Sequence, residues 1–289
     1  MKVTVLEPLG YCAGVMNAIT KAIKVKKDNP NKDIFVFGKL VHNNYTIEKL
    51  KEDGITTLEV NKENQVEVLK SLKQGSVIIF TAHGHDEELD RIAKANGLEI
   101  CDATCPVVKN NLELIKRKIK EGYKIFFIGK ENHPETNAVL SISKDIILFD
   151  LKQLKQYYKT TNSPVFVANQ TTLDYEELLG IHAEILKVFP NATIQNEVCS
   201  TTRLRQASIR NIPSDTDLIL VVGSNISNNT TKLYEIAKSL YKEKDIRLIE
   251  TINDLDINSI KNRRHVVVAS GASTSPDIVK EIESQLINL

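Results

Sequence analysis

Three cysteines divide this 289-residue chain into similar thirds, and each stands at the head of a repeated pattern. Cys12, Cys105 and Cys199 are 93 and 94 residues apart, and a glycine follows each of them after 26, 24 and 24 residues. Between cysteine and glycine, a stretch with helical spacing of apolar residues leads to a short apolar strand. Self-similarity at such a long period indicates three small domains rather than a solenoid.

Each third contains two short apolar strands, and a polar loop follows each strand. The first strands are expected at 34–37, 125–128 and 218–222, and the second at 77–80, 165–168 and 266–269. Strands of this kind that alternate with helices are typical of parallel sheets covered on both faces. The predicted fold class is α/β, with three similar small lobes built on mainly parallel sheets in a pseudo-threefold arrangement around a central cluster site.

The lobe boundaries follow from the cysteines. The first α/β lobe is expected at 13–103 with Cys12 at its head, the second at 104–197 and the third at 198–275. Residues 1–12 and 276–289 are expected to be terminal segments that pack on the lobes, and the first of them contains a strand-like run. The helical pattern after the third cysteine is the weakest, and it is carried by Leu204, Ala207 and Ile209.

The overall composition excludes several classes of partner. The net charge is +1, from 38 basic and 37 acidic residues, so the chain has no general attraction to nucleic acid or to anionic membranes. Its N-terminus lacks the pattern of a signal peptide, and no stretch approaches the roughly 18 apolar residues that cross a bilayer. We therefore expect a cytoplasmic protein. In a reducing compartment, cysteines indicate metal binding or catalysis more than disulfides.

The three repeated cysteines predict a metal centre with an open position. A cubane iron-sulfur cluster has a threefold axis through one iron, so thiolates from three equivalent lobes would bind three irons and leave the fourth open. Soft thiolates suit such a cluster. A zinc site of three cysteines and one histidine is the alternative metal centre, and any single cysteine could also be a small buried hydrophobe. Cys101 has no counterpart in the other thirds and is expected to be structural.

The polar loops predict an anion site. In open α/β sheets, ligands bind beyond the carboxyl ends of the strands, and helix N-termini there favour negative charge. The loops carry neutral or switchable donors that would suit a diphosphate: His42, His83, His133, Ser227, Asn229 and Ser273. His182 and His265 lie outside these loops and are expected to be surface or packing residues, whereas the role of His85 stays open.

Glu135 is a carboxylate within these loops, two residues after His133. We interpret it as a proton donor whose pKa is raised by partial burial and lowered again by nearby histidinium. The alternative is an exposed acid near the start of a helix. The chain has no G-x-G-x-x-G motif, and Gly122 to Lys130 lacks the spacing of a phosphate-binding loop. Electrons would therefore come from a separate protein donor.

Several short motifs of the chain resemble those of a known family. The chain resembles the 4-hydroxy-3-methylbut-2-enyl diphosphate reductase family from residue 10 to about residue 280. The matching segments are GYCAGV at 10–15, VHN at 41–43, AHG at 82–84, DATCP at 102–106, HPE at 133–135, QTT at 170–172, VGS at 222–224 and GAS at 271–273.

The resemblance implies a specific reaction, the last step of the methylerythritol phosphate route to isoprenoids. In that step (E)-4-hydroxy-3-methylbut-2-enyl diphosphate is reductively dehydroxylated to isopentenyl and dimethylallyl diphosphate, with reduced ferredoxin or flavodoxin as electron donor. By resemblance, Cys12, Cys105 and Cys199 hold a 4Fe-4S cluster, and Glu135, Thr171 and His133 are catalytic. The residues implied in substrate binding are His42, His83, His133, Thr171, Ser227, Asn228, Asn229 and Ser273.

Three short segments depart from the family pattern. Met16 and Asn17 replace an acidic and a basic residue, the run 136–138 differs, and Asn228 stands where a serine is common. A rival interpretation is a non-enzymatic iron-sulfur sensor or binding protein, and a third is a zinc-stabilised scaffold. Polar donors on all six loops favour the enzyme, since a sensor has no need for them.

Overall fold

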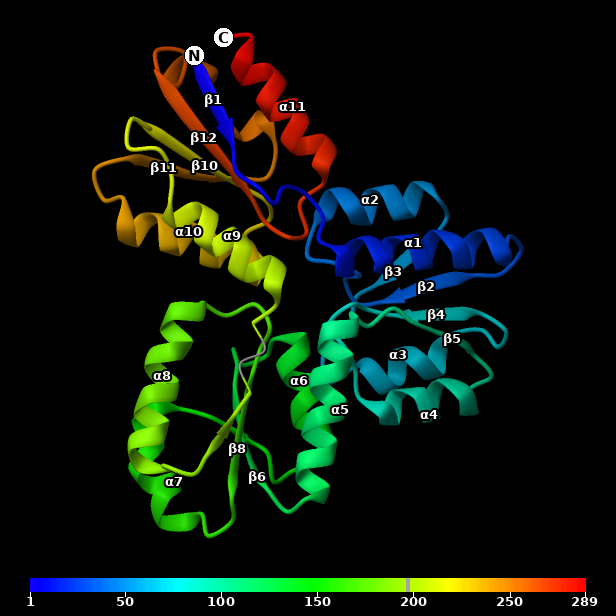
Figure 1. The fold of residues 1–289 in the computed structure, drawn as a ribbon. Coiled ribbons are helices and arrows are strands. Elements are labelled where there is room, and N and C mark those ends of the chain that lie inside the picture. The colour runs from blue at the N-terminus through cyan, green and yellow to red at the C-terminus, as the bar shows by residue number, and fades with distance from the viewer. Residues whose placement is uncertain (196–197) are drawn as a thin grey trace. The chain divides into compact units, whose positions relative to one another are not determined.

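The computed structural model describes residues 1–195 and 198–289, so the expected lobe boundary at residue 197 lies outside the described part of the chain. The strands of that part form three separate four-stranded sheets, and their pairings are parallel. Helices separate most successive strands (Figure 1). The prediction of three α/β lobes with parallel sheets is confirmed.

The three sheets have equivalent strand orders. In the first lobe the order is β3 (Thr56–Leu58), β2 (Ile34–Phe37), β4 (Val77–Phe80), β5 (Glu99–Asp102). In the second lobe it is β7 (Ile147–Leu148), β6 (Lys124–Ile128), β8 (Val165–Asn169), β9 (Thr193–Ile194). In the third lobe it is β11 (Asp245–Ile249), β10 (Leu218–Val222), β12 (His265–Ser270), β1 (Lys2–Val5). The six strands expected from the sequence all lie at or within one residue of the expected bounds.

The N-terminal strand β1 completes the sheet of the third lobe. It pairs with β12 from Lys2 opposite His265 to Val5 opposite Val268, in the position that β5 and β9 hold in the other sheets. We expected residues 1–12 to be a terminal segment that packs on the lobes, whereas part of it is an integral strand. The physical reason is that the edge of β12 would otherwise leave backbone N–H and C=O groups unpaired.

Helices cover both faces of each sheet, because alternate strand residues point to opposite sides. On the first sheet, α1 (Ala13–Asp28) and α2 (Asn44–Glu52) lie opposite α3 (Gln65–Ser71) and α4 (Glu87–Ala95). On the second, α5 (Pro106–Lys120) and α6 (Pro134–Ile142) lie opposite α7 (Leu154–Thr160) and α8 (Tyr175–Val188). On the third, α9 (Ser200–Arg210) and α10 (Asn228–Leu240) lie opposite α11 (Pro276–Ile287). Short 3-10 helices occupy Leu151–Gln153, Ile252–Asp254 and Ile257–Ser259.

Helix α9 buries a face that the sequence pattern did not indicate. Leu204 is 58% exposed and Ala207 is exposed as well, so only Ile209 of the expected apolar stripe is buried. The buried side chains of α9 are Thr202, Arg205, Gln206 and Ile209. Three of these four are polar, which explains why the third repeat looked weakest.

Each repeated cysteine stands where the chain leaves one sheet and enters a helix of the next lobe. Cys12 follows β1 of the third sheet and precedes α1, which packs on the first sheet. Cys105 follows β5 and precedes α5 of the second lobe, and Cys199 follows β9 and precedes α9 of the third. The three thiols therefore have the same place in the repeat.

The chain divides into two compact units. Unit 1 contains Met1–Met16, Val41–Glu48 and Cys199–Leu289, and unit 2 contains Asn17–Leu40 and Lys49–Val198. Cys12 and Cys199 belong to unit 1, and Cys105 belongs to unit 2. Within the described ranges, the helices are all too short or too polar to traverse a lipid bilayer.

The first-lobe core provides a test of this packing. Ile79 of β4 is fully buried in the cluster beneath α1 and α2, so Ile79→Ala should leave a cavity and lower the free energy of unfolding by about 2–5 kcal/mol. Val66→Ala, at a 37% exposed position of α3, should change it by no more than about 0.5 kcal/mol. Urea unfolding followed by circular dichroism measures both, and equal effects of the two variants would contradict the assigned core.

Candidate functional site

The three cysteines adopt a shared backbone geometry at helix N-termini. Cys105 and Cys199 are N-cap residues with nearly equal dihedral angles, φ −58° and ψ 134° against φ −53° and ψ 135°. Each cysteine carbonyl, including that of Cys12, accepts the N–H of the fourth following residue at 2.9 Å. Each thiol therefore stands before the first turn of a helix, where the helix dipole favours a negative ligand.

Three further hydrogen bonds involve Cys12 and Cys105. The N–H groups of Cys12 and Cys105 donate to the carbonyls of Ala272 and Ala82 at 3.0 Å, which ties each cysteine to the loop after a central strand. The Val15 N–H lies 3.4 Å from Cys12 Sγ and donates to it. Hydrogen bonds to the sulfurs are among the features that tune iron-sulfur clusters.

The three-cysteine set stays a prediction. Each of the three side chains is only partly buried, so each thiol is accessible to a ligand. Among residues 1–195 and 198–289, no three histidine, cysteine or carboxylate side chains are grouped to hold a single metal ion. A cubane cluster needs wider spacing of its thiolates than a single ion, since its irons lie between them.

In unit 2, Glu135 and Thr171 form a buried pair. Glu135 is the second residue of α6 and is 2% exposed. Its Oε1 accepts the backbone N–H of Thr171 and its Oε2 accepts the Thr171 hydroxyl, both at 2.9 Å. The alternative of an exposed acid is wrong, and the structure brings these two predicted catalytic residues together.

Burial raises the pKa of Glu135 to about 7, although two hydrogen bonds from Thr171 lower it in part. The desolvation of the carboxylate outweighs these bonds because the side chain has no cation as a partner among the groups that act on this pKa. Our sequence interpretation had the direction right and one cause wrong, since Thr171 and not a histidinium lowers this pKa. Glu135 can therefore hold a proton close to neutral pH.

Of the two predicted histidines of unit 2, His133 contacts this pair directly and His83 lies beside His133. The rings of His83 and His133 are 5.8 Å apart and nearly perpendicular. His133 caps α6, and its Nδ1 accepts the Glu135 N–H at 3.2 Å, which leaves Nε2 as the donor of the neutral ring. His83 Nδ1 lies 3.3 Å from the Thr81 hydroxyl.

Gln170 is a residue of this site that sequence reasoning missed. It is fully buried, and its Oε1 accepts the Lys130 N–H at 2.9 Å and lies 3.5 Å from the Thr136 hydroxyl. Its Nε2 donates to the Thr172 hydroxyl at 2.8 Å. These bonds fix the loop that presents Thr171. The sequence signal that could have identified Gln170 was its place in the QTT motif, of which only the Thr171 hydroxyl was assigned a role.

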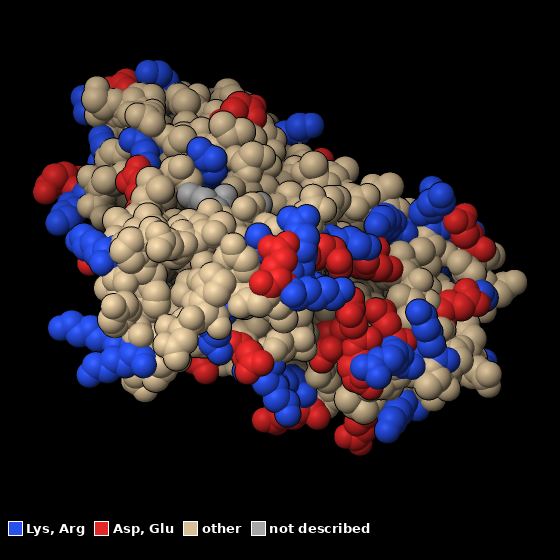
Figure 2. Space-filling view, turned by 60° about the horizontal axis from the view of Figure 1, so that its bottom comes forward, with Lys and Arg blue, Asp and Glu red and all other residues tan. Residues whose placement is uncertain are grey.

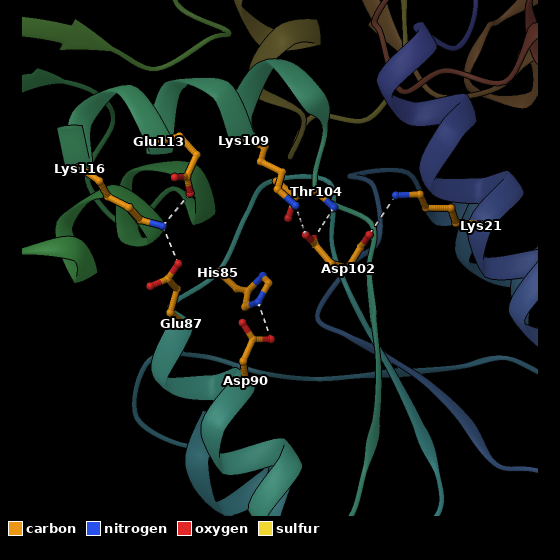
Figure 3. A network of polar contacts seen from close by, with 9 residues as sticks. All are labelled: Lys21, His85, Glu87, Asp90, Asp102, Thr104, Lys109, Glu113 and Lys116. Atoms are coloured by element: carbon orange, nitrogen blue, oxygen red, sulfur yellow. Dashed lines mark hydrogen bonds and ion pairs between the residues drawn. The ribbon is translucent and has the colours of Figure 1, made fainter. Parts of the chain in front are cut away.

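A charged network holds the segment before Cys105 (Figure 3). Asp102 accepts the Thr104 N–H at 2.9 Å and the Lys109 ammonium at 3.2 Å, and its carbonyl accepts Lys21 at 3.0 Å. Burial raises the pKa of Asp102, but the hydrogen bonds from Thr104 and Lys109 outweigh it and leave this pKa below its ordinary value. Asp102 is therefore a firmly ionised anchor for the loop.

A cleft of about 590 Å³ lies beside this network in unit 2. It is bordered by α4, α5 and α6. Lys116 of α5 contacts Glu87 of α4 at 2.5 Å and Glu113 of its own helix at 2.9 Å. Its lining includes none of the residues predicted to bind substrate. Several of the acidic and basic groups here form ion pairs with one another.

In unit 1, the loops after β10 and β12 meet. Ser273 donates to the Ser227 hydroxyl and lies 3.3 Å from it, and it is also 3.3 Å from the His42 carbonyl. Asn43 donates to the Ser273 carbonyl at 2.8 Å. Asn229 accepts the Ala272 N–H at 2.9 Å. The structure therefore joins His42, Ser227, Asn229 and Ser273 into one polar patch.

Helix α10 begins at this patch. Its N-cap is Ser227, whose hydroxyl accepts the Thr230 N–H at 3.4 Å. Asn228 and Asn229 follow in the first turn, and Asn228 is half-buried. Hydroxyl and amide donors beside the positive end of a helix are suited to a phosphate group.

The remaining histidines and Cys101 have structural environments. His85 stacks on Phe80 with ring centroids 3.7 Å apart and is 3.2 Å from Asp90. His182 is buried on α8, and burial lowers its pKa. His265 is also buried, so both expectations of packing roles fit their burial. Cys101 lies on β5 next to the first core, and burial raises the pKa of its thiol.

The surface charge is mixed. On the face shown in Figure 2, lysine and arginine side chains lie beside aspartate and glutamate side chains. This face offers an anionic polymer no continuous basic surface. The site loops supply local donors instead, as the balanced composition predicts.

Comparison with known proteins tests the family resemblance of this chain. A model of the LytB protein family matches residues 3–287. The chain belongs to the LytB protein family. The family resemblance inferred from the motifs is thereby confirmed, because relatives of this chain carry the name 4-hydroxy-3-methylbut-2-enyl diphosphate reductase.

Two curated LytB relatives are similar over nearly the whole chain. The 4-hydroxy-3-methylbut-2-enyl diphosphate reductase of Shouchella clausii is 35% identical and covers 98% of this chain and 89% of its own length. The protein of the same name from Malacoplasma penetrans is 35% identical, with 95% and 93% covered.

Two solved structures are similar in fold. The E-1-hydroxy-2-methyl-but-2-enyl-4-diphosphate reductase from Plasmodium falciparum superposes with a TM-score of 0.87 and 28% identity, covering 99% of this chain and 88% of that one. A (E)-4-hydroxy-3-methyl-but-2-enyl diphosphate reductase, described as the terminal enzyme of the non-mevalonate pathway, gives a TM-score of 0.71 and 26% identity over all of both chains.

The raised pKa of Glu135 predicts a distinct pH dependence of stability. Its folded pKa of about 7 exceeds the ordinary 4.5, so the folded state loses stability as pH rises between these values and none further above them. Glu135→Gln removes this loss. The difference in free energy of unfolding between the variant and the wild type should therefore rise by up to about 3 kcal/mol from about pH 5 to about pH 8. Chemical unfolding across this range measures the difference.

The matched control is Glu131→Gln, an exposed carboxyl four residues away. Its difference from the wild type should stay flat across the same range. A flat difference for Glu135→Gln would show that Glu135 is ionised in the folded protein throughout.

Proposed function

We propose that this chain reduces (E)-4-hydroxy-3-methylbut-2-enyl diphosphate to isopentenyl and dimethylallyl diphosphate, the last step of the methylerythritol phosphate pathway. The LytB relatives carry the corresponding name. The observation that supports the proposal most is the buried Glu135–Thr171 pair. A buried carboxyl with a pKa of about 7 beside a hydroxyl suits proton delivery at neutral pH.

Cys12, Cys105 and Cys199 are the residues that would hold a 4Fe-4S cluster. Their fit rests on soft sulfur donors, on equivalent positions before three helices and on the Val15 hydrogen bond to a sulfur. When bound, such a cluster supplies electrons one at a time and an iron without a protein thiolate.

The polar loops would bind the diphosphate. Ser227, Ser273 and Asn229 offer hydroxyl and amide groups at the start of α10, and Asn228 adds a further amide in place of the family serine. The remaining donors proposed for the anion are His42, His83 and His133. Neutral donors of this kind bind a phosphate without an arginine clamp.

Glu135 and Thr171 would manage the proton for the leaving hydroxyl. The overall reaction takes two electrons and two protons, breaks one C–O bond and releases water. Protonated Glu135 would donate one proton to the leaving oxygen, and the Thr171 hydroxyl would orient that oxygen. His133, whose Nδ1 is already engaged, would present Nε2 to the substrate. The second proton goes to either end of the allyl system, which gives the two products.

The electron donor would be reduced ferredoxin or flavodoxin, since the chain lacks a dinucleotide-binding motif. We also propose a cytoplasmic location, where such donors and reduced thiols occur. The departure at Thr136 leaves the acid in place, because Thr136 is fully buried beside Gln170.

The direct test is anaerobic turnover of the allylic diphosphate with an artificial one-electron donor, alongside iron and sulfide analysis. We expect both products, and iron and sulfide in equal amounts. A brown protein that binds no diphosphate would favour the sensor. A colourless zinc protein would contradict the reductase.

Glu135→Gln tests the proton donor within this reaction. The amide keeps the size of the side chain and cannot donate a carboxyl proton, so turnover should fall by roughly 10² or more. Iron content and substrate affinity should stay unchanged, as in the Glu131→Gln control. Near-normal turnover of the anaerobic variant would remove Glu135 from the mechanism.

A further inference from the structure

Arg205 is a buried arginine within unit 1, and its hydrogen-bond partners among residues 1–195 and 198–289 are uncharged. It lies on α9 and is 3% exposed. Its Nη1 donates to the Ser270 carbonyl at 2.5 Å and to the Ser270 hydroxyl at 3.1 Å. Its Nη2 donates to the Gly10 carbonyl at 2.5 Å. Burying a cation without a bonded carboxylate is costly, so this charge needs an explanation.

These bonds connect the segments that carry two of the repeated cysteines. Gly10 precedes Cys12 by two residues, and Arg205 belongs to the helix that begins directly after Cys199. The Gly10 N–H also donates to the Ser270 hydroxyl at 3.0 Å. Gly10 has φ +66°, and a Cβ there would lie 2.7 Å from Pro276 Cγ, so the turn before Cys12 is closely constrained. Arg205 thus braces both cysteine segments against the end of β12.

Among the described residues, two cysteines and Glu7 act electrostatically on Arg205. Burial lowers the pKa of Arg205 to about 10, and Cys12, Glu7 and Cys199 act in the opposite direction. Glu7 is exposed to solvent, which screens its charge. The guanidinium stays charged at neutral pH, and Cys12 and Cys199, the residues proposed to hold the cluster, lie within reach of its charge.

We propose that Arg205 is a positioning residue for the Cys12 and Cys199 segments and, as a fixed buried positive charge, raises the reduction potential of the cluster they hold. This inference rests on the proposed function. Each electron added to the cluster adds one negative charge and breaks no bond, so a nearby fixed cation favours the reduced state. The electron comes from the one-electron donor.

The test is a redox titration of the cluster in anaerobically prepared holoprotein, followed by electron paramagnetic resonance. Arg205→Gln removes the charge and should lower the equilibrium ratio of reduced to oxidised cluster at least tenfold at fixed applied potential, a shift of about 59 mV for a one-electron couple. Arg205→Lys keeps the positive charge and loses the two-pronged guanidinium group. The reduction potential of its cluster should therefore stay close to that of the wild type. Arg203→Gln, at an exposed position of the same helix, should leave the potential unchanged.

The outcomes separate this proposal from the function beneath it. Failure of the wild type to hold a cluster would contradict the proposed function itself. A wild-type potential in Arg205→Gln, or equal shifts in the Gln and Lys variants, would overturn the role of the charge. If Arg205→Gln fails to hold a cluster, the Lys variant decides: a potential near that of the wild type supports the charge, and a shifted potential or a lost cluster overturns it.

Discussion

The passage of the chain from one sheet to the next is the constraint on which the site depends. In each lobe the edge strand ends, a cysteine follows within a few residues, and a helix of the next lobe begins. The cysteine must leave the extended strand and cap a helix, so its backbone geometry is set by secondary structure on both sides. Three such passages give three thiols the same place in the repeat, and β1 supplies the edge strand that precedes Cys12.

The chemistry of the site depends on burial more than on the number of charges. Glu135 is ionised with difficulty because water is excluded from it and its partner is a neutral hydroxyl. Asp102 has the opposite behaviour because a lysine and a backbone N–H stabilise its charge. Two carboxyl groups of one unit therefore differ in pKa through their surroundings, which is how acid and anchor are separated.

Much of the architecture could be predicted from local sequence patterns. The cysteine period and the six central strands follow from short apolar runs, because fully buried strands have a strong local signal. The place of β1 could not be predicted in this way, since its partner β12 lies more than 250 residues away along the chain. Helix α9 was obscured for another reason: its buried face is built from Thr202, Arg205 and Gln206.

The residues of the candidate site also differ in whether local sequence patterns predict them. Motif positions identified Glu135 and Thr171, and the structure brings them together. Gln170 and Arg205 act through contacts with backbone groups far away in sequence, and no periodicity reports such contacts. Partial burial of Glu135 was inferred from its motif, but the Thr171 hydrogen bonds that lower its pKa were not, because they depend on tertiary packing.

The central claim is that three thiolates, one from each lobe, hold a four-iron cluster whose last iron has no protein ligand. Mössbauer spectroscopy of anaerobically isolated, ⁵⁷Fe-enriched protein tests it most directly, because it resolves irons by their ligands. The account predicts three irons in sulfur-rich sites and one distinct iron whose signal responds to added diphosphate substrate. Four equivalent irons, or a two-iron spectrum, would contradict it.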